Sequence, residues 1–132
     1  MTNAMMFEEF ISTEKENSYA SALILTANDY DEPYREQVCR KIKNCGVRYL
    51  YFTGAYIQQW KDSAEKAELR LQAEKPLAIP SMNDVMETAL LKTPEDVIEE
   101  IEYQSRESDR FLILYDDAEF WASVKKHIRT FE

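Results

Sequence analysis

The stretch Ala20-Ser-Ala-Leu-Ile-Leu-Thr-Ala27 decides the fold. It is apolar along its length without strict alternation, which is typical of a β-strand that is covered on both faces. The residues Asn28-Asp-Tyr-Asp31, followed by Pro33, supply turn and helix-start chemistry. We therefore expect a helix that runs to about Cys45, with Gly46 at its left-handed C-terminal cap.

Strand-like and helix-like segments alternate through the rest of the chain. The patterns predict further strands at 47–53, 77–79 and 110–115, and further helices at 57–71, 94–104 and 117–130. This alternation implies parallel strands joined by crossovers. The sequence thus predicts a single α/β domain over 1–132, a three-layer sandwich whose mostly parallel sheet of about four to five strands has helices on both faces. Residues 1–17 form an extension or edge element in this scheme, and 82–92 fits a helical turn, an extra strand or an irregular excursion.

Two of the predicted helices have especially clear signals. In the helix at 57–71 an apolar stripe indicates core packing, and the other face is expected to be solvated with mixed charge (stripe Ile57, Trp60, Ala64, Ala67, Leu71; other face Lys61, Asp62, Glu65, Lys66, Glu68, Arg70). In Thr93-Pro-Glu-Asp96, Thr93 can cap a helix whose first turn accepts proline and favours acids.

Composition excludes several classes of function. No run approaches the roughly 18–20 apolar residues of a membrane span. Residues 1–16 have no basic or apolar region of a secretory signal, so the cytoplasm is the expected location. Two glycines, Gly46 and Gly54, cannot build a P-loop or a GxGxxG fingerprint, and a net charge of −9 argues against a nucleic-acid partner.

The residue types that bind metals or perform catalysis are sparse. Cys39 and Cys45 are six positions apart, a spacing that suits neither a CxxC motif nor a disulfide framework, so buried or half-buried thiols are expected. His127 is the only histidine, and neither it nor Lys75 has an obvious partner for a hydrolytic triad. We therefore expect no zinc site, no cofactor and a binding protein rather than an enzyme.

The net charge is confined to one stretch, residues 83–120. This stretch has 12 acidic and 3 basic residues, a balance of −9, whereas the remaining residues have 13 of each sign and are neutral. One interpretation is an acidic solvated face that keeps the protein in solution. The other is electrostatic steering toward a basic protein, with neighbouring aromatic side chains as anchors.

One enzyme family offers an alternative. The chain looks superficially like haloacid-dehalogenase-type phosphatases, with Asp29-Tyr-Asp31, Thr53, Lys75 and Asp116-Asp117 in the order of the family's motifs. This resemblance implies a Mg²⁺ site built from the aspartates at strand ends. Glu32-Pro33 departs from the family pattern, and no room remains for the hairpin that the family inserts after its first motif. The same aspartates could instead cap helices.

A second resemblance concerns the whole chain. Its size, acidity and α/β pattern resemble bacterial immunity proteins, including those of contact-dependent growth-inhibition systems. Gly46-Val-Arg-Tyr-Leu-Tyr-Phe-Thr-Gly54 with Trp60-Lys-Asp-Ser-Ala-Glu65 is also similar to an uncharacterised small bacterial α/β family. The first resemblance implies neutralisation of a basic toxin domain, often a nuclease.

The hypothesis names one acidic surface for the toxin. The residues expected to contact it are Asp84, Glu87, Glu99, Glu100, Glu102, Tyr103, Glu107, Asp109, Asp116 and Asp117. Glu95, Asp96, Asp117 and Glu119 have a local explanation in helix starts. Glu99, Glu100, Glu102, Glu107 and Asp109 have none, so the partner hypothesis depends on them.

Overall fold

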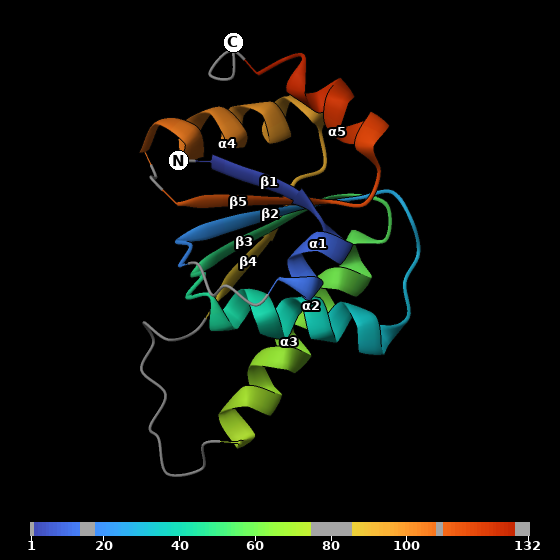
Figure 1. Cartoon of the computed structure of the whole chain (residues 1–132), viewed down its shortest axis with the longest axis vertical. Helices are drawn as coiled ribbons and strands as arrows, with labels where there is room; N and C mark the ends of the chain where they lie inside the picture. The colour runs from blue at the N-terminus through green and yellow to red at the C-terminus, as the bar shows by residue number, and fades with distance from the viewer. Residues whose placement is uncertain (1, 14–17, 75–85, 108–109, 129–132) are drawn as a thin grey trace.

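The computed structural model describes residues 2–13, 18–74, 86–107 and 110–128. Strands and helices alternate along the chain (Figure 1). They are β1 (Thr2–Met6), α1 (Phe7–Ser12), β2 (Ser21–Thr26), α2 (Glu32–Asn44), β3 (Tyr49–Gly54), α3 (Ile57–Ala73), β4 (Glu87–Leu90), α4 (Pro94–Glu107), β5 (Phe111–Tyr115) and α5 (Ala118–Lys125). Within the described ranges no helix is long and apolar enough to cross a membrane.

The strands form one parallel sheet in the order β1-β5-β2-β3-β4. Helices α1, α2 and α3 lie on one face, and α4 and α5 lie on the other (Figure 1). The predicted three-layer α/β sandwich with a parallel sheet is confirmed. The N-terminal extension supplies both an edge strand, β1, and a short helix, α1.

Strand β2 is covered on both sides, as its sequence predicts. All six of its residues are buried. Ala22 and Ile24 pack in the cluster beneath α1, α2 and α3, whereas Leu23 and Leu25 pack with α4 and α5. Alternate side chains of one apolar strand therefore belong to two separate cores, because successive residues of a strand point to opposite faces.

The helix-boundary signals are confirmed where the structure describes them. The Asp31 side chain accepts a hydrogen bond from the Tyr34 amide and caps α2, which ends next to Gly46 at a φ of +89°. The Thr93 hydroxyl accepts from the Asp96 amide at the start of α4. In α3 the middle of the predicted stripe is buried, at Trp60, Ala64 and Ala67, and its two ends are half-buried.

Three sequence predictions differ from the structure or fall outside the described residues. The strand predicted at 77–79 lies outside the described residues, and the strand β4 forms within 82–92, one of the alternatives for that segment. The sequence predicts a last helix that reaches 130, but α5 ends at Lys125, although Ile128 beyond it is still buried. The polar face of α3 is not simply solvated, because three of its charged residues pair with α2.

These pairs hold two parallel helices side by side. Lys66 bonds Glu32 at 2.6 Å, Arg70 bonds Glu36, and Glu74, just past the end of α3, accepts from Arg40 at 2.7 Å. Each pair is separated by 34 positions, so the ladder runs along the helices without a shift in register. Lys43 and Glu68 add a pair at 3.0 Å. Four cations of α2 and α3 are thus matched by a carboxylate of the neighbouring helix or its end.

Asp116 joins the loops that follow the adjacent strands β2 and β5. Its carboxylate accepts hydrogen bonds from the amides of Ala27 (2.8 Å) and Asn28 (2.9 Å) and from the Tyr30 hydroxyl (3.2 Å). The Tyr30 ring stacks on Tyr34 at 4.8 Å. Burial, followed by the charge of Asp116 and the hydrogen bond to it, raises the pKa of Tyr30 far above its ordinary value. The phenol therefore remains a donor at neutral pH.

We expect Asp116→Ala to lower the free energy of unfolding by about 2 kcal/mol, because it leaves two amides and a phenol without their charged acceptor. Urea denaturation monitored by circular dichroism measures this change. Asp29→Ala is the matched control, since Asp29 is exposed in the β2 loop that Asp116 binds, and its effect should stay within about 0.5 kcal/mol. Equal stability of the two variants would contradict the role given to Asp116.

Both cysteines are buried thiols, as predicted. Cys39 is 0% exposed and Cys45 is 8% exposed. Burial raises the pKa of the Cys39 thiol to about 12. Because the thiolate is the reactive form, Cys39 is protected both by its position and by its protonation.

Iodoacetamide should therefore leave Cys39 unmodified in the folded protein at neutral pH and should alkylate both cysteines in denaturant. Peptide mass spectrometry after timed labelling measures this difference. Alkylation of Cys39 at the same rate with and without denaturant is the opposite outcome, and it would show that this part of the core opens readily.

Candidate functional site

The structure gathers part of the predicted acidic surface around one hollow. Its volume is about 360 Å³, and we call it the α4 hollow; it is lined by Leu91, Asp96, Glu99, Glu100 and Tyr103. Three of these residues, Glu99, Glu100 and Tyr103, belong to the set predicted for partner binding. Asp96, which the sequence explains as a helix-start residue, lies with them.

The hollow exists because the helices on this face leave part of the sheet open. Helix α4 packs on β2 and β5, where it buries Val97 and Ile101 against Leu23 and Phe111. The same face of β3 is less covered, and Tyr49 is 43% exposed there. Tyr51, two residues further along β3, is half-buried. The α4 residues thus form one side of the hollow, and the partly exposed face of β3 lies beneath it.

Glu100 is held in a fixed orientation by buried neighbours. The Ser21 hydroxyl donates to the Gln104 side-chain oxygen at 2.8 Å, and the Gln104 amide donates to the Glu100 carboxylate at 3.0 Å. Ser21 and Gln104 are both buried. Burial, followed by the hydrogen bond with Glu100, raises the pKa of Tyr51 far above its ordinary value, so the phenol stays protonated beside this carboxylate.

The other polar groups of the hollow face solvent. Asp96 and Glu99 are exposed, and neither takes part in an ion pair with a residue that the structure describes. Tyr103 is 52% exposed. Carboxylates bind guanidinium and ammonium groups by charge-assisted hydrogen bonds, and an aromatic face attracts the same cations. The arrangement can therefore hold a basic side chain.

Glu87 lies on the same face of the sheet as the hollow. It is the first residue of β4 and pairs in register with Tyr49, which in turn pairs with Ser21 of β2. Residues paired in a parallel register point to the same face of the sheet. Ser21 bonds Gln104 of α4, so Tyr49 and Glu87 also lie on the face that α4 covers. Glu87 is exposed and extends the acidic surface toward the edge strand.

The remaining residues of the predicted set are placed differently. Glu107 is exposed at the end of α4, and Glu102 is half-buried in that helix but does not line the hollow. Asp116 and Asp117 lie at the carboxyl end of β5, where Asp116 binds the loop amides and Asp117 caps α5. Both therefore have roles within the fold. Asp84 and Asp109 lie outside the described residues.

The aspartates considered for a Mg²⁺ site are used at helix ends and in a loop. Asp31 caps α2, Asp117 caps α5 through the amides of Glu119 and Phe120, and Asp116 binds Ala27 and Asn28. Within the described ranges no three His, Cys, Asp or Glu side chains form a group that could hold a metal ion. Lys75, the lysine of that alternative, lies outside these ranges.

Sequence reasoning did not find Ser21, Tyr51 or Gln104 as parts of the site. Ser21 looks like the first residue of an apolar strand, and Gln104 looks like a polar residue near a helix end. Their contact joins positions 83 residues apart, so no local pattern reveals it. The one available signal is that Glu100 and Gln104 are four apart, a spacing that places them on one side of a helix.

Comparisons of this chain with protein-family models, with characterised proteins and with solved structures gave no match.

Proposed function

We propose that this protein is a toxin-neutralising immunity protein that binds a basic toxin domain through the α4 hollow. One observation carries the proposal: the Glu100 carboxylate is oriented by Gln104 and Tyr51 in an open hollow that also holds Asp96 and Glu99. No cation lines this hollow among the residues described. A basic side chain from another molecule would supply the missing counter-charge.

The geometry suggests how such a partner is recognised. An arginine entering the hollow would meet a carboxylate whose position is already set, so less conformational entropy is lost on binding. The planar guanidinium can bond a carboxylate with two parallel hydrogen bonds and can lie over a tyrosine ring. In this proposal Glu100 and Tyr103 provide the specific contacts.

Charge outside the hollow would act at longer range. The chain has a net charge of −9, and the region 83–120 accounts for all of it. Such a field accelerates encounter with a basic partner and weakens as salt is added. Glu87 and Glu107 are exposed outside the hollow and would contribute to this steering.

Neutralisation in this proposal needs binding alone. Toxin domains that act on nucleic acids have basic surfaces for phosphate groups, and an acidic protein seated on such a surface blocks the substrate. The protein would act in the cytoplasm, where the toxin meets its target. Catalytic residues and cofactors have no part in this mechanism.

We expect Glu99→Lys with Glu100→Lys to abolish capture of a basic protein from lysate of the native cells, because the two changes reverse the charge at the centre of the hollow. Affinity capture with quantitative mass spectrometry measures the loss. For the wild-type protein, raising salt from about 50 to 500 mM should weaken capture about tenfold or more.

Asp62→Lys with Glu65→Lys is the matched control. These two carboxylates are exposed and lie on α3, across the sheet from α4, and their reversal changes the net charge by the same amount. The control should retain the partner. The proposal is wrong if both double variants capture the same proteins as the wild type, or if co-expression of the wild type does not protect cells from the captured protein.

A further inference from the structure

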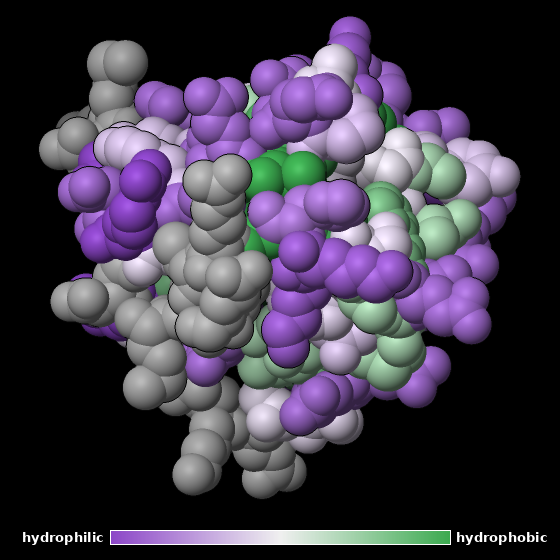
Figure 2. Space-filling model, turned by 90° about the horizontal axis from the view of Figure 1, so that it is seen from above, coloured by the Kyte–Doolittle hydropathy of each residue, from purple (hydrophilic) through white to green (hydrophobic). Residues whose placement is uncertain are grey.

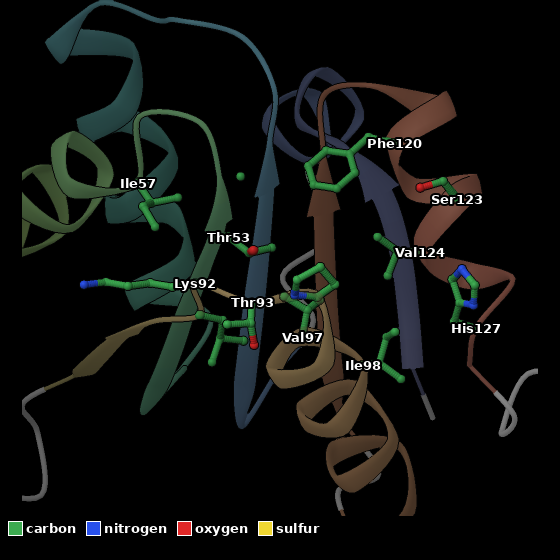
Figure 3. A pocket seen from close by; sticks show the side chains of 13 residues that line it. Thr53, Ile57, Lys92, Thr93, Val97, Ile98, Phe120, Ser123, Val124 and His127 are labelled. Carbon is green, nitrogen blue, oxygen red and sulfur yellow. The ribbon is translucent and has the colours of Figure 1, made fainter.

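A second concavity lies between α4, α5 and the carboxyl ends of β3 and β4. We call it the α4–α5 cleft. Its volume is about 510 Å³, and its apolar walls are formed by Ile57, Leu91, Val97, Ile98, Phe120 and Val124. In Figure 3, Phe120 and Val124 of α5 point into the space that Thr53, Val97 and Ile98 border from the other side. Viewed over α4 and α5, a small hydrophobic patch interrupts a mainly hydrophilic surface (Figure 2).

The size and position of the cleft are those of a ligand site. Pockets for small molecules usually have volumes of roughly 300–1,000 Å³ and are lined by apolar and aromatic groups with a few polar ones. Here the polar contribution comes from the hydroxyl groups of Thr53, Thr93 and Ser123. In parallel α/β sheets ligands bind at the carboxyl ends of the strands, which is where this cleft opens.

The charges around the cleft differ from those of the whole protein. Among the residues that the structure describes, no acidic side chain lines the cleft, whereas Lys92 and His127 do. Figure 3 shows Lys92 at one edge with its ammonium group pointing away, and His127 at the opposite edge on the α5 side. A lysine at the edge still attracts an anion, because its long side chain can turn and its charge acts over several ångströms.

The start of α3 reinforces this positive character, because its first residue, Ile57, lines the cleft. Pro94, the first residue of α4, lines the cleft too, but Glu95 and Asp96 in the first turn of α4 offset its helix dipole. Helix α3 starts after Tyr56, at a φ of 59°, with no side chain bonded to its first amides. The start of a helix carries a partial positive charge. The basic side chains and the start of α3 therefore act together at an apolar cleft that no described carboxylate lines.

We propose that the α4–α5 cleft binds a small aromatic or otherwise apolar organic molecule that carries one anionic group. The apolar body lies among Val97, Phe120 and Val124, and the anionic group lies toward Lys92 or His127. The acidic α4 hollow shares Leu91 with the cleft, so an anionic group oriented toward that hollow is repelled. This binding activity is independent of the toxin partner.

Two fluorescent probes of similar shape test the proposal on the whole protein. Anilinonaphthalene sulfonate has an aromatic body and one anionic group, and N-phenylnaphthylamine has a similar body without charge. We expect saturable binding of both to the folded protein, about tenfold tighter for the sulfonate. Ser123→Trp should abolish binding of both probes because it fills the cleft. Ala122→Trp, on the same helix but outside the lining, should change neither.

Charge variants test the anionic class of ligand. Lys92→Glu with His127→Glu should weaken binding of the sulfonate about tenfold and leave the neutral probe within about twofold. Lys125→Glu with Lys126→Glu is the control, since these exposed lysines do not line the cleft; it should leave both probes within about twofold. Near-ultraviolet circular dichroism verifies that each variant is folded, because such probes also bind loosely packed states.

Three results overturn the proposal. The first is no saturable binding of either probe to the folded wild-type protein. The second is unchanged binding in a folded Ser123→Trp variant. The third is an equal effect of the two charge variants on the sulfonate, which would show that the anionic group responds to overall charge and not to this cleft.

Discussion

The rest of the structure depends on the burial of β2 on both faces. The four central residues of Ser21–Thr26 are apolar, and each of its six residues is buried. Such a strand is stable only with a helix layer on each side, because either face left in water would cost about 1.5–3 kcal/mol per large side chain. The three helices α1–α3 cover one face, but the opposite face has α4 and the short α5 among the described elements. These two helices cover the central strands and leave concave surface beside α4 and between α4 and α5. The α4 hollow and the α4–α5 cleft both follow from this unequal coverage.

The charges follow the same division between the layers. On the α2–α3 side, Glu32, Glu36 and Arg40 each meet an opposite charge across the helix pair. On α4, acids at the first turn are stabilised by the helix dipole, but this effect fades within one turn. Glu99 and Glu100 lie beyond it and repel their neighbours. Stability alone does not account for two carboxylates there, one of which is held in place by buried Gln104. Residues that break a local rule in this way are expected at functional sites.

Local signals in the sequence predict most of the fold and part of the site. The apolar run at 20–27, the caps at Asp31 and Thr93, and the stripe of α3 each depend on neighbours within a few residues, and the structure confirms them. The α2–α3 ion pairs, the Asp116 bonds and the Ser21–Gln104 contact join residues far apart in the chain. These contacts depend on the order of the strands in the sheet, and local residue patterns do not predict that order. The acidity of α4 was visible in the sequence, whereas the orientation of Glu100 was not.

The aspartates at the ends of the strands form hydrogen bonds within the fold, and this affects where a partner can bind. In parallel α/β proteins the crevice at the carboxyl ends of adjacent strands often holds catalytic or cofactor-binding groups. Between β2 and β5 of this chain, Asp116 fills that position and binds the backbone of the β2 loop, while Asp31 and Asp117 cap helices. These carboxylates have hydrogen-bond partners within the protein, so binding a ligand through them would disrupt the loops they hold. The carboxylates of the α4 hollow do not hold a loop or cap a helix in this way, and the bond from Gln104 orients Glu100. In the proposed function, recognition of a basic partner at α4 would therefore cost the fold little.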